Sequence, residues 1–137
     1  MTPTLLGRIH TRCVLMFAVG LPLTVALFPW LPGDPPFSTL LMVLATVLLL
    51  GIVVWEFLYH LLQQFRWEKD WPLIFGLLTA VNEGVLAFVV LRSTGVDVAV
   101  RPFVIHFGAV WVAIWAMAAG PMRVLSLRWR YQGGRVW

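Results

Sequence analysis

Four long apolar runs constrain this chain more than any other feature of its sequence. They cover approximately residues 13–30, 38–63, 72–91 and 102–122. A helix that crosses the hydrocarbon core of a bilayer needs about 20 such residues, at about 1.5 Å of rise each. The sequence therefore predicts an all-α integral membrane protein, in which residues 1–137 form a single domain of four transmembrane helices.

The composition excludes several other classes of protein. Of the 137 residues, 61% are hydrophobic and 12% are charged, whereas a soluble domain has about a quarter of its residues charged. The single cysteine excludes a disulfide scaffold and a cysteine-based metal site. The sequence has no serine–histidine–aspartate set, no glycine-rich phosphate loop and no specific metal motif, so we expect a protein that is not an enzyme.

Basic residues predict the orientation of the helices, because cytoplasmic loops carry an excess of lysine and arginine. Eight of them fall on the side of the chain ends: Arg8, Arg12, Arg66, Lys69, Arg123, Arg128, Arg130 and Arg135. Only Arg92 and Arg101 fall on the other side. We therefore expect both termini in the cytoplasm of a bacterial cell and a multi-pass protein of its inner membrane. The net charge of +4 is then a signal of topology and not of nucleic-acid binding.

The first run contains Gly20 and Pro22, and a kink is expected there because proline removes a helical hydrogen bond. Arg8 and Arg12 resemble the start of a signal peptide, but no small-residue cleavage site follows, so the run is interpreted as a retained span. In size the chain resembles the small four-helix multidrug transporters, which carry a membrane glutamate in their first helix. The first run here has no acidic residue, so the resemblance fails at its central motif.

Small residues predict which helix faces pack closely, since membrane helices associate through small side chains. Two such faces are formed by Gly76, Ala80 and Gly84 in the third run and by Ala109, Ala113 and Gly120 in the fourth. We expect these two faces to pack against each other. Trp111 and Trp115 lie on the opposite side of the fourth run, where three interpretations are open: contact with lipid, with another subunit or with a small molecule.

Polar residues inside the runs mark candidate functional sites, because a charged side chain there costs about 2.5–3.5 kcal/mol. Glu83 lies in the middle of the third run beside Asn82 and Thr79, and His106 lies in the fourth run, closer to the outer surface. Glu83 has three open interpretations: a neutral acid bonded to a neighbouring helix, a proton-binding group on an ion path, or the partner of a basic residue in another subunit. Direct contact between Glu83 and His106 is not expected.

The second run ends in a polar face near the cytoplasm. Its members recur at spacings of three and four residues: Glu56, Tyr59, His60 and Gln63. Glu56 and His60 are expected to pair, so the face is interpreted as an anchor that sets the depth of the helix. A metal would need His10 as a third ligand, and a haem between His60 and His106 would need a second subunit. We therefore predict no metal and leave a haem or a quinone as an alternative.

Basic and aromatic residues alternate after the fourth run, where Arg128, Trp129 and Arg130 follow the pair Gly120–Pro121. Glycine and proline end helices, so we expect a break at this pair. The tail of residues 123–137 is expected to lie on the inner leaflet or against a partner, with its arginines at anionic lipid headgroups and Trp129 at the membrane interface.

These features favour a non-catalytic membrane subunit or anchor that docks in a larger assembly through its helix faces and its basic cytoplasmic surface. One alternative is a small oligomeric transporter or proton or ion channel that uses Glu83. A third is an electron-transfer subunit that binds haem or quinone. The expected partners are the bilayer and other membrane subunits or further copies of the chain.

Overall fold

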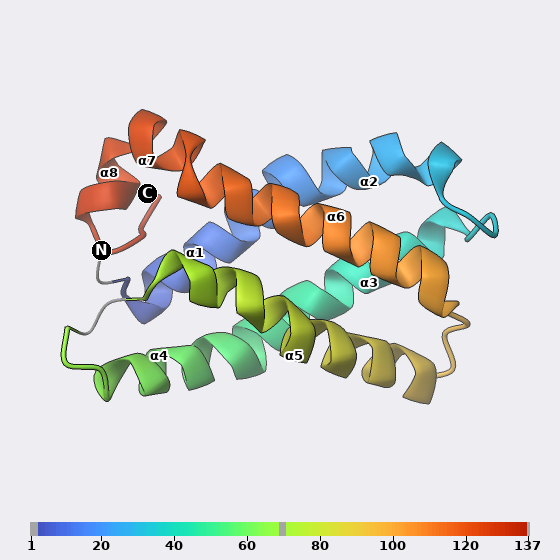
Figure 1. The fold of residues 1–137 in the computed structure, drawn as a ribbon, viewed down its shortest axis with the longest axis horizontal. Coiled ribbons are helices and arrows are strands. Elements are labelled where there is room, and N and C mark those ends of the chain that lie inside the picture. Colours follow the sequence, from blue (N-terminus) through green and yellow to red (C-terminus); the bar gives the residue numbers. More distant parts are fainter. Residues whose placement is uncertain (1–2, 69–70, 137) are drawn as a thin grey trace.

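The computed structural model describes residues 3–68 and 71–136, and the regular structure in this part of the chain is helical throughout. Four stretches are long and apolar enough to cross a membrane: Leu5–Trp30, Phe37–Gln64, Leu73–Ser93 and Val100–Leu125. Both chain ends lie at one end of the bundle, here called the termini end (Figure 1). The links of residues 31–36 and 94–99 lie at the other end, called the loop end.

The first stretch begins at Leu5 instead of the predicted Cys13. It consists of α1 (Leu5–Leu15), the π-helical η1 (Met16–Gly20), α2 (Leu21–Leu27) and the 3-10 helix η2 (Phe28–Trp30). The hydroxyl of Thr4 caps α1 by accepting the backbone N–H of Gly7 at 3.1 Å. Arg8 and Arg12 do not end the helix, because both are held inside the bundle by ion pairs.

The other three stretches begin and end close to their predicted limits. They contain α3 (Phe37–Leu50), the π-helical η3 (Gly51–Trp55), α4 (Glu56–Gln64), α5 (Leu73–Ser93) and α6 (Val100–Ala119). Two short helices follow, α7 (Pro121–Leu125) and α8 (Leu127–Tyr131). Gly120 separates α6 from α7 with φ −112° and ψ −88°, so the break predicted at the glycine–proline pair is present.

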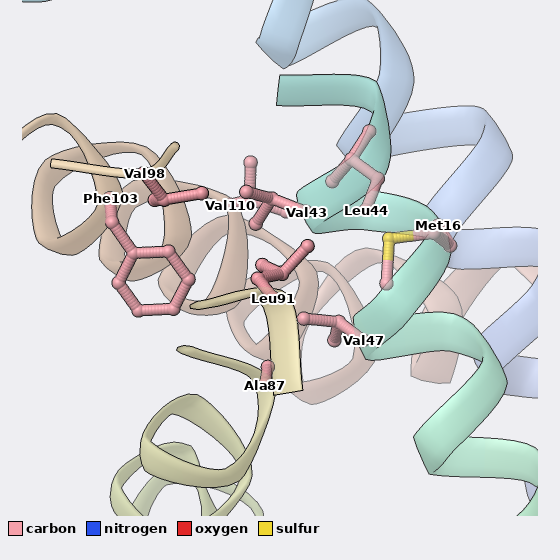
Figure 2. Packing of buried hydrophobic residues seen from close by; sticks show 9 residues of the cluster. All are labelled: Met16, Val43, Leu44, Val47, Ala87, Leu91, Val98, Phe103 and Val110. Carbon is pink, nitrogen blue, oxygen red and sulfur yellow. The ribbon is translucent and has the colours of Figure 1, made fainter. Parts of the chain in front are cut away.

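The bundle has an apolar core that extends from its middle to the loop end. Figure 2 shows nine buried members: Met16, Val43, Leu44, Val47, Ala87, Leu91, Val98, Phe103 and Val110. They come from η1, α3, α5, α6 and the link before α6, so this one cluster joins all four stretches. The termini half of the bundle is built differently and contains the buried charged groups, whereas the buried polar pair of Thr24 and His106 lies nearer the loop end.

The C-terminal segment folds back on the start of α1. Trp129 is 4% exposed, and its indole N–H donates to the hydroxyl of Thr11 at 2.7 Å. The backbone N–H of Thr4 donates to the carbonyl of Gly133 at 2.8 Å, and Gly7 lies against Gly133 so closely that no side chain fits between them. The prediction that Trp129 contacts lipid or a partner is therefore wrong, because α1 covers its ring.

Arg128 and Arg130, its neighbours, are exposed on α8. The Nε of Arg128 donates to Gln132 at 3.0 Å, and the guanidinium of Arg130 lies 5.4 Å from the ring of Tyr131. Burial of Trp129 thus turns the two arginines outward.

Candidate functional site

Four charged side chains meet inside the termini half of the bundle. Arg8 and Arg12 come from α1, Glu56 from the start of α4 and Glu83 from the middle of α5. Arg12 donates from Nη1 and Nη2 to the two oxygens of Glu83 at 2.7 and 3.0 Å, and from Nε to Glu56 at 2.6 Å. Nη1 of Arg8 lies 3.6 Å from the second oxygen of Glu56. Two arginines therefore balance two glutamates in one network, here called the charge cluster.

The charge cluster is almost sealed from solvent. The side chain of Glu83 is 2% exposed, those of Arg8 and Glu56 are 7% exposed, and that of Arg12 is 12% exposed. A bidentate arginine–carboxylate pair is a strong arrangement for charges that have lost their water, because two charge-assisted hydrogen bonds replace it. The partner of Glu83 thus comes from the first helix of the same chain, and the three interpretations offered for this residue did not include Arg12.

Local irregularities of the helices make room for this cluster. The π-helical turn η1 follows Arg12 by one helical turn, and η3 ends directly before Glu56. Gly51 opens η3, and a Cβ built there would lie 2.5 Å from the side chain of Arg12. A π-helical turn widens the helix and re-aims the residues beyond it, and such turns are frequent at functional sites. Where a kink was expected at Gly20 and Pro22, the π-helical turn η1 ends at Gly20 and α2 continues through Pro22.

Three members of the predicted polar face at the end of the second run point inward: Glu56, Tyr59 and Gln63. Gln63 accepts from Nη2 of Arg8 at 2.8 Å, and the hydroxyl of Tyr59 accepts from Asn82 of α5 at 2.8 Å. The ring of Tyr59 stacks between Trp55 and Trp71, with centroids at 5.6 and 5.2 Å.

His60, the fourth member, is half-buried, and Glu56 binds the arginines of α1 in place of the predicted pair with His60. Within residues 3–68 and 71–136, no three side chains of His, Cys, Asp or Glu come together as metal ligands.

His106 lies deep in the bundle and faces the first stretch. It is 0% exposed, and its Nε2 lies 2.8 Å from the hydroxyl of Thr24, which is itself 0% exposed. The Thr24 hydroxyl donates its own hydrogen to the carbonyl of Gly20 at 2.8 Å. Nε2 must therefore carry the hydrogen that it donates to Thr24. Nδ1 is then an acceptor, and it is buried without a partner among the described residues.

Trp111 and Trp115 connect α6 to α5. The indole N–H of Trp111 donates to the carbonyl of Gly76 at 2.9 Å, and that of Trp115 donates to the carbonyl of Leu73 at 2.9 Å. Both rings are only half-exposed or less. The prediction that they lie on the side of α6 away from the third stretch is wrong, since they lie against α5.

The small residues of α5 make space for aromatic rings of α6. A Cβ on Gly84 would lie 2.7 Å from the ring of Phe107, and one on Gly76 would lie 3.5 Å from the ring of Trp115. The expected contact of two small-residue faces is therefore replaced by glycines against aromatic rings, while the His106 face of α6 turns toward Thr24.

The other small residues of the two predicted faces lie in different surroundings. Ala80, Ala109 and Ala113 are half-buried. Gly120 is exposed and ends α6, so the prediction that it packs against another helix is wrong.

A chamber of about 240 Å³ lies beside the charge cluster and is lined by residues of α1, η1, α3, α4, α5 and α6. Arg8, Arg12 and Glu56 form part of its wall, together with Thr79 of α5 and His106 of α6. Four tryptophans also line it: Trp71, Trp111, Trp115 and Trp129. The chamber therefore combines charged and aromatic side chains.

Sequence reasoning missed the two arginines of the charge cluster because they precede the apolar part of the first run. A signal was present. Arg8 and Arg12 are four residues apart, so they share one helix face. Two carboxylates inside other runs, Glu56 and Glu83, require opposite charges, and those two arginines match them in number.

Comparison with protein-family models, with curated proteins and with solved structures gives no match to this chain. The site is therefore interpreted from its own geometry.

Proposed function

We propose that this chain is a non-catalytic membrane protein that binds a small amphipathic molecule in the chamber. The observation that carries the proposal is the chamber itself, about 240 Å³ of space lined by arginines and tryptophans. Protein interiors are close-packed, so a bundle that had only to hold its helices together would fill this space with side chains. Concave, mainly apolar sites with a few converging polar groups are typical of ligand binding.

The proposed orientation places both termini, and hence the chamber, in the cytoplasmic half of an inner bacterial membrane. Arg8 and Arg12 no longer support it, because Glu56 and Glu83 neutralise them inside the bundle. Five described basic residues at the termini end still do: Arg66, Arg123, Arg128, Arg130 and Arg135. Lys69 lies outside the described residues. A C-terminal fluorescent protein should be bright and a C-terminal alkaline phosphatase inactive, and the reverse result would contradict this orientation.

A proton or ion channel through Glu83 is less well supported than a binding chamber. Both oxygens of Glu83 accept hydrogen bonds from Arg12, which holds the carboxylate in a pair. Toward the loop end the described core is largely apolar, and its buried polar groups are the pair of Thr24 and His106. An ion would have to leave its water to cross that region.

A pair of alanines in α6 allows a matched test. Ala118 lines the chamber, whereas Ala116 is exposed on the outside of the same helix. The purified protein in nanodiscs would be titrated with 2-naphthol while its tryptophan fluorescence is recorded, with protein-free nanodiscs as the blank. We expect saturable quenching in the wild type and in Ala116→Phe, and its loss in Ala118→Phe. Quenching that does not saturate, or that is equal in the two variants, would overturn the proposal.

A second function, docking in a larger assembly, is favoured by one surface. Arg123, Arg128 and Arg130 are exposed on α7 and α8, and Leu125 and Leu127 beside them are 82% and 62% exposed. Such a basic and apolar surface suits an acidic partner at the membrane face. Purification in a mild detergent should then yield the chain together with a second protein, in a ratio that falls when the three arginines are replaced by glutamine. A monomer without any co-purifying protein would contradict this function.

A further inference from the structure

The chamber is lined by both charged and apolar side chains. Arg8, Arg12 and Glu56 contact one another in the charge cluster, and Arg123 also lines the chamber. Glu83 stands behind Arg12 and accepts two of its hydrogen bonds. Three arginines thus face two glutamates at the described part of the chamber, which leaves one positive charge. Leu15, Val47 and Ile114 supply aliphatic surface, and the tryptophans supply aromatic surface.

The two arginines of α1 differ in how fully their hydrogen-bond donors are used. Arg12 donates from Nε, Nη1 and Nη2 to the two glutamates. Arg8 donates from Nη2 to Gln63 at 2.8 Å, but its Nη1 stays 3.6 Å from Glu56, beyond a hydrogen bond. The Nε of Arg8 is fully buried and has no acceptor among the described residues, so a ligand in the chamber cannot reach it. Nη1 therefore supplies the donor capacity that Arg8 keeps on the chamber wall, although the side chain is only 7% exposed.

The position of the Arg8 guanidinium is defined by its neighbours. It lies 4.6 Å from the centroid of the Trp71 ring, and Gln63 holds one of its nitrogens. A guanidinium held in this way is prepared to bind a carboxylate through Nη1, because a charge-assisted hydrogen bond from a fixed donor is strong. The carboxylate of a ligand would supply the acceptor that Nη1 lacks.

We infer that the molecule bound in the chamber is an organic anion, with a carboxylate that pairs with Arg8 and an aromatic or branched aliphatic body that lies among the tryptophans. The inference rests on the proposed function, since it names the chemical class of the ligand for the same chamber. The surplus positive charge favours an anion over a neutral molecule or a cation, and Trp111, Trp115 and Ile114 favour an apolar body. Arg8 is the residue that recognises the carboxylate of the ligand.

Three probes of almost the same shape separate charge from apolar burial: 4-phenylbutyrate, 4-phenylbutyramide and 4-phenylbutylamine. Binding would be measured by tryptophan fluorescence and by thermal shift, with the wild-type protein in nanodiscs of zwitterionic lipid. We expect the carboxylate to bind about tenfold or more tightly than the amide, as a charge-assisted hydrogen bond predicts. We expect the amine to bind most weakly. This comparison needs no variant, so it holds even if a change at Arg8 prevents folding.

Variants then assign the preference to one residue. Arg8→Gln should bind the carboxylate and the amide equally, whereas Arg101→Gln, a change at an exposed arginine at the start of α6, should keep the wild-type preference. Equal binding of carboxylate and amide by the wild type, or tighter binding of the amine, would overturn the anion inference while leaving the binding chamber in place. Saturable binding of none of the three probes, together with a negative 2-naphthol titration, would overturn the proposed function itself.

Discussion

The two halves of the bundle hold their helices together by different means. In the loop half, apolar side chains meet directly: Ala87 is 0% exposed, and Val43 and Leu91 are each 2% exposed. In the termini half, long polar side chains cross between the helices, as Arg12 does from α1 to Glu56 and Glu83. Beside them lies a chamber of about 240 Å³.

This difference separates a part of the molecule held by apolar contacts from a part held by ion pairs, and the chamber borders both, since Met16, Val43 and Val110 of the apolar core also line it. Apolar contacts between membrane helices are not strongly directional, so the loop half depends on shape. Ion pairs have fixed geometry, so the charge cluster can keep α1 and α5 in register across a space that side chains do not fill. Four predictions test this comparison, in order of decreasing expected effect.

Removing the central guanidinium should produce the largest loss. Arg12→Met leaves Glu56 and Glu83 buried without their main partner, and breaking a buried pair in this way costs about 3–5 kcal/mol. The free energy of unfolding would be measured by circular dichroism during titration with sodium dodecyl sulfate in mixed micelles. The double variant Arg12→Met with Glu83→Leu should recover part of the loss, because it no longer leaves Glu83 unpaired. Unchanged stability of Arg12→Met would show that the termini half does not depend on the cluster.

The space at Gly51 should be the next most sensitive feature. In Gly51→Ala the new Cβ would lie 2.5 Å from Arg12, which its ion pairs hold in place. Overpacking of this kind costs about 1–3 kcal/mol. Gly108→Ala is the matched control, because a Cβ there has nothing within 4 Å. That control should be neutral or raise stability by up to about 1 kcal/mol, as alanine favours helix over glycine. Equal effects of the two changes in the same unfolding assay would contradict the geometry around Gly51.

The buried pair of Thr24 and His106 should contribute less. Thr24→Val removes the hydroxyl that accepts from Nε2 of His106. Hydrogen bonds between membrane helices contribute about 0.6 kcal/mol on average and at most about 1.7 kcal/mol. Thr94→Val provides a control, since the exposed Thr94 donates to carbonyls of its own helix. The free energy of unfolding should fall for Thr24→Val and stay nearly constant for Thr94→Val, and a larger fall for Thr94→Val would count against the role assigned to the pair.

The C-terminal segment should show the smallest effect on global stability. Trp129→Phe keeps an aromatic ring but removes the N–H that donates to Thr11 at 2.7 Å. A loss of about 0.5 kcal/mol is expected, at the low end for a hydrogen bond, because the backbone contact between Thr4 and Gly133 remains. Limited proteolysis within residues 121–136 should become faster than in Tyr131→Phe, where the ring is 73% exposed. Equal cleavage of the two variants would mean that the contact does not hold the segment.

Much of the fold could be predicted from the apolar runs. The second, third and fourth runs lie within a few residues of the helices found, and the break at Gly120 is present. The start of the first helix could not be predicted in this way, because hydropathy treats Arg8 and Arg12 as the end of a span. Inside a bundle, an arginine that pairs with a carboxylate can lie within a helix and need not mark its end. The carboxylates that pair with Arg12 are far away in the sequence.

The candidate site was only partly predictable, for the same reason. Glu83, Glu56, Tyr59 and Gln63 stood out as polar residues within apolar runs, and all four are buried in the termini half. The direction in which Trp111 and Trp115 point could not be read from their spacing, because both faces of that helix are apolar. Contact with the carbonyls of Gly76 and Leu73 decided it.

The sequence by itself determined that the chain forms four helices long and apolar enough to span a membrane, because hydrophobicity and length are properties of each run alone. Only the tertiary structure decided that α1, α4 and α5 share one charge cluster and that a chamber lined by Arg8, Arg12 and Arg123 lies beside it. Those features depend on which side chains from distant runs approach to within hydrogen-bonding distance. That approach is set by helix packing and by the π-helical turns, which no single run encodes.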